Sequence, residues 1–130
     1  AGFTSGEPWL PLNTDASTVN VAAQEDDPAS LLNWYRQLIS LRRAEPALHA
    51  GDYAAWDGGS DDLFCYMRSH GDDRLLILLN FAEQPVDARL PEGEWQVLTG
   101  PGQSAQSAIR CAPEEGAILK KCGAAARAKS

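Results

Sequence analysis

The spacing of apolar residues changes near Pro46, and this change most constrains the fold of the 130-residue chain. Before Pro46, apolar side chains recur at three- and four-residue steps, at Leu31, Trp34, Leu38 and Leu41. That spacing predicts one long amphipathic helix over residues 28–45. After Pro46, apolar residues alternate along short runs bounded by Gly, Pro and Asp, which predicts strands. The chain is therefore expected to be mainly β with one long helix.

The ends of this helix carry their own signals. Asp27 is a suitable capping residue, Pro28 suits the first helical position, and Pro46 ends the helix. Leu32 and Ile39 widen the apolar stripe beyond what a lone surface helix needs. The helix is therefore expected to bury much of its circumference against another part of a protein.

The run RLLILLNF at residues 74–81 is apolar on both faces, so its strand is expected to be central and covered on both sides. Strands of alternating or mixed character are predicted around it, at residues 51–57, 62–69, 85–90, 94–99, 108–111 and 117–121. Short strands at this spacing, joined by turns of hairpin length, predict an antiparallel β-sandwich.

The two flanks of these elements differ in kind. Residues 1–27 are rich in turn formers and aperiodic, yet they carry Phe3, Trp9 and two leucines, which predicts a loop packed on a partner domain. Residues 123–130 are rich in Ala, Lys and Arg and are predicted to form a disordered tail. Because the chain opens on Ala1 without an initiator Met, we expect it to be part of a longer protein.

The formal net charge is −7, and the basic residues do not cluster. Nucleic acid and anionic membrane surfaces are therefore not expected as partners. The longest apolar run, at residues 75–79, is far shorter than the roughly 20 residues that span a bilayer. These features are typical of a cytoplasmic protein.

No metal or cofactor site is expected from the cysteines and histidines. Cys65, Cys111 and Cys122 form no closely spaced pair, and His49 and His70 stand alone. A disulfide between Cys111 and Cys122 is geometrically possible across a terminal hairpin. The alternative, three reduced thiols in a cytoplasmic protein, is favoured.

No catalytic group stands out among the polar residues. The carboxylates occur mostly as adjacent pairs in turns or at a helix start, where capping and turn formation account for them. Trp56 and Trp95 lie in predicted strands and belong either to the core, which is favoured, or to a surface that stacks on sugars. Trp9 is predicted to pack against an absent partner.

Two blocks of sequence resemble bacterial α-glucosidases and oligo-1,6-glucosidases of the α-amylase superfamily (glycoside hydrolase family 13). The first block is AGFTSGEPWLPLN at residues 1–13. The second runs from Asn20-Val21 through Gln24, Asp27-Pro28 and SLLNWYR at residues 30–36 to GDY at residues 51–53. The order and spacing of both blocks match, and the later β part matches only in character.

This resemblance implies a (β/α)8 barrel whose end is present here. Residues 1–27 would be the loop region near the eighth barrel strand, residues 28–45 the closing barrel helix, and residues 46–122 an antiparallel C-terminal β domain. The family's catalytic Asp, Glu and Asp would lie before Ala1, so this chain is expected to hold none of them. Phe3 and Trp9 would lie near the substrate entrance.

The expected function is that of a structural C-terminal portion of a retaining enzyme that releases terminal α-linked glucose. Its expected partners are the missing catalytic barrel and, in the intact enzyme, an oligosaccharide substrate. A related sucrose isomerase, trehalose synthase or glucosyltransferase is the first alternative. An independent carbohydrate-binding β module that uses Trp56 or Trp95 is the second.

Overall fold

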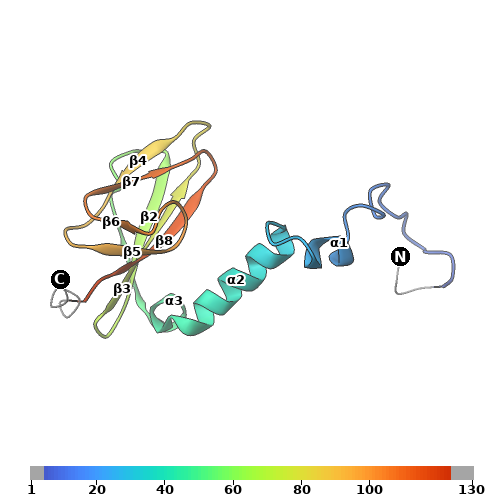
Figure 1. Cartoon of the computed structure of the whole chain (residues 1–130), viewed down its shortest axis with the longest axis horizontal. Helices are drawn as coiled ribbons and strands as arrows, with labels where there is room; N and C mark the ends of the chain where they lie inside the picture. Colours follow the sequence, from blue (N-terminus) through green and yellow to red (C-terminus); the bar gives the residue numbers. More distant parts are fainter. Residues whose placement is uncertain (1–4, 124–130) are drawn as a thin grey trace. The chain divides into compact units, whose positions relative to one another are not determined.

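A computed structural model describes residues 5–123 of the chain, which divides into two compact units, Ala1–Ala44 and Glu45–Ser130 (Figure 1). Phe3 lies outside the described residues, and so does the predicted disordered tail apart from Gly123. The two units are described separately below.

The first unit contains a short helix that the sequence pattern did not predict, α1 (Val21–Glu25). Asn20 starts it, because the Asn20 Oδ1 accepts a 2.9 Å hydrogen bond from the N–H of Ala23. Five residues are too few to display a helical period, so the capping residue is the local signal that marks this helix.

The long helix of the first unit is α2 (Leu31–Ala44), which begins three residues after the predicted start at Pro28. Asp27 does not cap it, because its Oδ1 accepts the N–H of Ala29 at 2.9 Å and closes a local turn. Ser30 takes the capping role, since its Oγ accepts the N–H of Asn33 at 3.3 Å.

The second unit opens with a further helix, α3 (Pro46–Ala50), so the described residues hold more than the single helix expected. Helix α2 ends at Ala44, two residues before Pro46, and Pro46 begins α3. Both are compatible with proline, which has no N–H to donate and fits the first turn of a helix.

The rest of the second unit is antiparallel β structure. All seven predicted strands form within the described residues, and the two-residue β6 adds to them. Their bounds are β1 (Asp52–Ala55), β2 (Leu63–His70), β3 (Asp73–Asn80), β4 (Val86–Arg89), β5 (Trp95–Thr99), β6 (Ser104–Ala105), β7 (Ala108–Cys111) and β8 (Gly116–Lys121).

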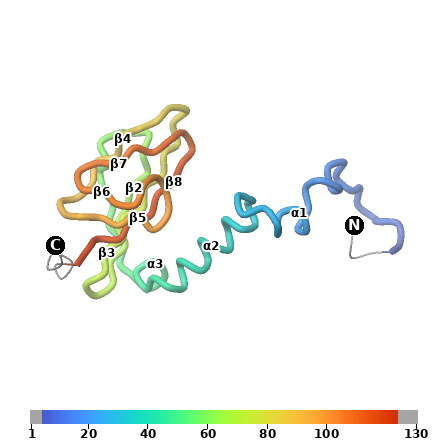
Figure 2. Tube along the Cα trace, viewed as in Figure 1, coloured from blue at the N-terminus to red at the C-terminus, as the bar shows by residue number. Residues whose placement is uncertain are grey.

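Among residues 45–123, the strands form a larger sheet in the order β1-β2-β3-β8-β5-β6 and a small sheet of β4 and β7. Strand β8 returns to lie between β3 and β5 (Figure 1). The trace also shows β4 and β7 side by side, although two further strands separate them in the sequence (Figure 2).

Strand β3 is central and buried on both faces, as the run RLLILLNF predicted. Leu76 and Leu78 point into the main core, which both sheets line together. Leu75 and Ile77 point to the opposite face, where they pack with Ala47 of α3. The chain is thus mainly antiparallel sheet with few helices, and α3 covers part of the outer face of the larger sheet.

Candidate functional site

The predicted substrate-entrance residues are not brought together by the described structure. Phe3 lies outside the described residues. Trp9 is 91% exposed, and Leu10 and Leu12 beside it are also exposed. Their position near a substrate entrance therefore stays a prediction, but the indole of Trp9 is available for contact with a further molecule or domain.

Helix α2 presents a second apolar surface, which we call the α2 face and define as Leu31, Trp34, Tyr35 and Ile39. All four side chains are exposed, Leu31 by 65% of its surface. At 3.6 residues per turn they lie on one side of the helix. Apolar side chains gathered on one side of a helix are normally covered by another part of a protein.

In the second unit, aromatic side chains gather on the outer face of the larger sheet. The ring centroid of Tyr66 lies 5.4 Å from that of Tyr53 and 5.5 Å from that of Phe64. Tyr53 and Phe64 are half exposed, and Phe81, just after β3, is 72% exposed. This part of the outer face is a further apolar surface that residues 45–123 leave exposed.

Trp95, in β5, and Trp56, just after β1, both contribute to the core. Trp95 is fully buried, and its Nε1 donates to the carbonyl oxygen of Pro91 at 2.9 Å. The interpretation of Trp95 as a sugar-stacking residue is therefore wrong. Trp56 packs against the same core, and its Nε1 donates to the carbonyl oxygen of Arg89 at 2.9 Å.

Several carboxylates are engaged in ion pairs. The short contacts are Asp57–Arg89 at 2.8 Å, Glu25–Arg36 at 3.0 Å, Asp87–Arg110 at 3.3 Å, and Lys120 with both Glu45 at 2.8 Å and Asp73 at 3.2 Å. Within residues 5–123, no group of three or more His, Cys, Asp and Glu side chains could hold a metal ion. In the same range, no helix is long and apolar enough to cross a membrane.

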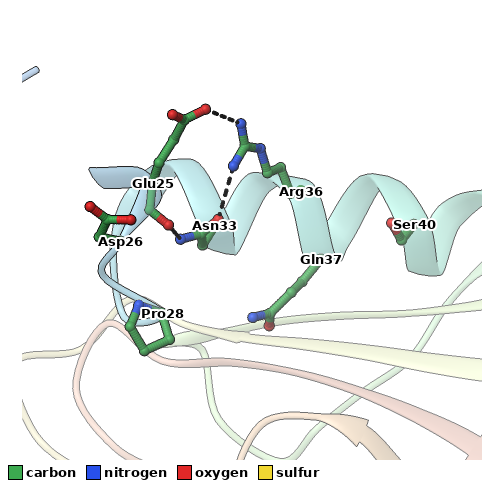
Figure 3. Close-up of a pocket in the computed structure, with 7 residues that line it drawn as sticks. All are labelled: Glu25, Asp26, Pro28, Asn33, Arg36, Gln37 and Ser40. Carbon is green, nitrogen blue, oxygen red and sulfur yellow. Dashed lines mark hydrogen bonds and ion pairs between the residues drawn. The ribbon is translucent and has the colours of Figure 1, made fainter. Parts of the chain in front are cut away.

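The most connected polar cluster of the first unit lies where α1 meets α2 (Figure 3). The Asn33 amide donates to backbone carbonyls around the end of α1, and Arg36 bonds both Asn33 Oδ1 and the carboxylate of Glu25. A groove of about 410 Å³ borders the cluster, lined by Glu25, Asp26, Pro28, Asn33, Arg36, Gln37 and Ser40. Because backbone carbonyls engage the Asn33 amide, this cluster is organised to hold the chain rather than to perform chemistry.

All three cysteines lie within the described residues and are free thiols. Burial raises the pKa of Cys65 from 9.0 to about 11, with the nearby Cys111 as a second cause. Burial also raises the pKa of Cys111. Both are thus packing thiols of the core, and Cys111 does not bridge to the partly exposed Cys122.

Two protein-family models match consecutive parts of the chain. The model described as "Alpha amylase, catalytic domain" matches residues 1–51, and the model described as "Maltogenic Amylase, C-terminal domain" matches residues 53–101. The two matches meet where α3 ends and β1 begins.

Curated proteins and solved structures agree with these matches. The chain is 32% identical to an oligo-1,6-glucosidase of Heyndrickxia coagulans over 91% of its length, and 36% identical to a probable α-glucosidase of Rhizobium meliloti (strain 1021) over 78%. The crystal structure of the trehalulose synthase MutB from Pseudomonas mesoacidophila MX-45 superposes with a TM-score of 0.80 at 33% identity, covering 92% of this chain.

The chain spans about a fifth of these relatives, covering 21% and 18% of the two curated proteins and 23% of the synthase. It corresponds to a part of such enzymes, with residues 1–51 matching the catalytic-domain model and residues 53–101 matching the C-terminal-domain model. The chain belongs to the α-amylase family of glycoside hydrolases.

Proposed function

We propose that this chain is the C-terminal portion of an α-glucosidase-type retaining glycoside hydrolase that releases terminal α-linked glucose from short oligosaccharides. Residues 1–27 would form the loop region near the eighth barrel strand, the helix predicted at residues 28–45 would close the barrel, and residues 46–122 would form the C-terminal domain. The exposed α2 face carries this proposal, because a helix of a catalytic barrel needs such a surface and an isolated one does not.

The proposed division of labour follows from where the apolar surfaces lie. Trp9 and the α2 face both belong to the first unit, within the part that the catalytic-domain model matches. Burying about 100 Å² of apolar surface contributes roughly 2.5 kcal/mol, so docking the α2 face on the remainder of the barrel would stabilise both. The chain would thus support the active site, while the catalytic carboxylates would come from the rest of the enzyme.

Phe3 and Trp9 are proposed to stand near the substrate entrance of the intact enzyme. An exposed indole suits this role, since its flat apolar face and its N–H group together match the mixed surface of a sugar. The intact enzyme is proposed to work in the cytoplasm, where its buried, unreactive Cys65 and Cys111 would stay reduced.

Hydrolysis of p-nitrophenyl α-glucoside tests the proposal. The 130-residue chain alone should release no nitrophenol, whereas the enzyme that contains it should turn the substrate over and release glucose with retained anomeric configuration. Turnover by the chain alone would contradict the proposed division of labour.

The docking role has its own test. Ile39→Glu places a charge in the α2 face, so it should abolish association of the chain with the separately expressed remainder of the enzyme. Ser40→Glu is the matched control, because Ser40 lies on the far side of the helix from Leu31. Equal association of both variants would argue against docking through the α2 face.

A second candidate is a sucrose isomerase or related transglycosylase. The structural similarity to a trehalulose synthase favours it as specifically as the sequence similarity to oligo-1,6-glucosidases favours hydrolysis. Incubating the enzyme with sucrose separates the two, since an isomerase yields rearranged disaccharide and a hydrolase yields free glucose.

A further inference from the structure

We propose that Asn33 is a positioning residue that sets substrate affinity by holding the segment that carries Trp9. This inference rests on the proposed function. It assigns a specific task to the junction of α1 and α2, where three side-chain amides, those of Asn20, Gln24 and Asn33, bond the backbone.

Asn33 closes the end of α1. Its Nδ2 lies 3.0 Å from the carbonyl oxygen of Gln24, 3.2 Å from that of Glu25 and 2.8 Å from that of Asp27. The last carbonyls of a helix have no partner within it, so they need donors from outside. A single primary amide supplies its two N–H groups to this set of three.

Gln24 closes the start of α2 in return. Its Oε1 accepts the N–H of Leu32 at 3.0 Å, which is one of the amides that a helix start leaves without an internal partner. Ser30 joins both sides, since its Oγ donates to the Gln24 carbonyl at 2.6 Å and accepts the N–H of Asn33 at 3.3 Å. The two helix ends therefore cap each other, and the angle between α1 and α2 is fixed by this exchange.

The hydrogen bonds continue upstream toward the exposed tryptophan. Asn20 caps α1, and its Nδ2 donates to the carbonyl oxygens of Ala16 at 3.3 Å and Ser17 at 3.2 Å. The N–H of Ala16 in turn donates to the carbonyl oxygen of Asn13 at 3.2 Å. The segment from Trp9 to Leu12 directly precedes this hydrogen-bonded stretch. The path of the segment therefore depends on the junction of α1 and α2 that Asn33 holds.

The geometry points to positioning and not to ligand binding at Asn33 itself. The side-chain nitrogen of Asn33 already donates to backbone carbonyl oxygens, and its Oδ1 accepts a hydrogen bond from Arg36 Nη1 at 3.3 Å (Figure 3). The indole of Trp9 is 91% exposed and is free to contact a sugar.

Asn33→Asp tests the inference in the enzyme that contains this chain. It keeps the side-chain shape but turns a carboxylate oxygen toward three carbonyls, so KM should rise about ten-fold while kcat stays within about two-fold. Gln24→Met, which breaks the junction from its other side, should do the same. Gln37→Glu adds the same charge one turn along α2 and should leave KM unchanged.

A double-mutant cycle with Trp9→Ala separates positioning from general destabilisation. If Asn33 acts through Trp9, Asn33→Asp should raise KM no further once Trp9 is Ala. An unchanged KM in both junction variants, or an equal rise of KM in the Trp9→Ala background, would overturn the inference.

If the proposed function is wrong, the result is different: the wild-type enzyme that contains this chain shows no activity on α-glucosides. Hydrogen exchange of the 130-residue chain gives a readout that does not depend on activity. Asn33→Asp should speed exchange of the amides of residues 13–24 at least ten-fold relative to Gln37→Glu. Equal exchange in the two variants would also overturn the inference.

Discussion

The side-chain nitrogen of Asn80 lies 2.8 Å from the carbonyl oxygen of Ala112, and this hydrogen bond joins the end of β3 to the turn after β7. The same Nδ2 donates to the carbonyl oxygens of Gln84 at 3.0 Å and Cys111 at 3.3 Å, and Oδ1 accepts the N–H of Ala82 at 2.9 Å. One buried amide therefore links the larger sheet to the smaller one.

Asn80→Asp is expected to destabilise the chain by about 2–4 kcal/mol. A carboxylate donates nothing to the three carbonyls, and it would be a buried charge without a cation beside it. Urea unfolding followed by tryptophan fluorescence measures the change. Gln84→Glu, at an exposed position in the same turn, is the control and should change the free energy of unfolding by less than about 0.5 kcal/mol.

Lys120 joins two carboxylates, with its Nζ 2.8 Å from Glu45 and 3.2 Å from Asp73. Lys120→Met should cost about 1–3 kcal/mol, because the side chain of Glu45 is 14% exposed and would lose its cation. Thermal unfolding of both proteins at neutral pH measures this difference. Lys121→Met, at the neighbouring exposed position, serves as the comparison.

The pH dependence of that difference has a defined sign. The hydrogen bond with Glu45 raises the pKa of Lys120 above its ordinary 10.5. A cation with a raised pKa stabilises the folded state fully below its unfolded pKa, and this contribution is lost as pH rises through the folded value. The stabilities of wild type and Lys120→Met should therefore converge above pH 10.5, and a gap that stays constant there would count against the ion pairs.

The second unit could be predicted closely because its strands obey local rules. RLLILLNF is apolar on both faces, and β3 is buried on both faces; turn formers bound each strand that was expected. The first unit departed from prediction because its start signals compete. Asp27 and Ser30 are both capping residues, and the contacts of Gln24 and Asn33, six and three residues from Ser30, decide in favour of Ser30.

In the candidate site too, features set by neighbouring residues could be predicted, and contacts between residues distant in the sequence could not. The exposure of the α2 face followed from a stripe wider than a surface helix needs. The reciprocal caps of Gln24 and Asn33 did not follow, because they join residues nine positions apart across a turn. The sequence signal for these caps was the presence of polar residues on both sides of Pro28, Gln24 before it and Asn33 after it.

Gly100 follows β5 at a place where a side chain has no room. Its φ is +118°, and a Cβ there would lie 2.7 Å from the Cβ and 2.9 Å from the Cα of Ala117. Gly100→Ala should therefore destabilise the chain by about 2–4 kcal/mol, from the clash and the left-handed backbone together. Gly102→Ala isolates the second cause, because Gly102 has a φ of +77° and open space around it. Its cost should be about 1–2 kcal/mol, and equal costs in a denaturant titration would contradict the clash.

The three thiols are expected to differ in reactivity according to their burial. At pH 8 a thiol of pKa about 11 is ionised to roughly one part in a thousand, so Cys65 should react with an aromatic disulfide reagent far more slowly than an ordinary cysteine of pKa 9.0. Cys111 should be slow for the same reason, while the partly exposed Cys122 should react first. One fast equivalent that disappears in Cys122→Ser, followed by two more on adding denaturant, is the expected result.

Ionisation of Cys65 is expected to lower the stability of the chain at alkaline pH. Because burial raises the pKa of Cys65 from 9.0 to about 11, its protonated form is favoured in the folded chain. Its contribution to stability is complete below pH 9 and is lost as pH rises toward 11, where the unfolded chain already carries the thiolate. Cys65→Val cannot ionise, so its stability should fall less than that of wild type between pH 9 and pH 11. Parallel losses in urea titrations across this range would show that Cys65 is not the group responsible.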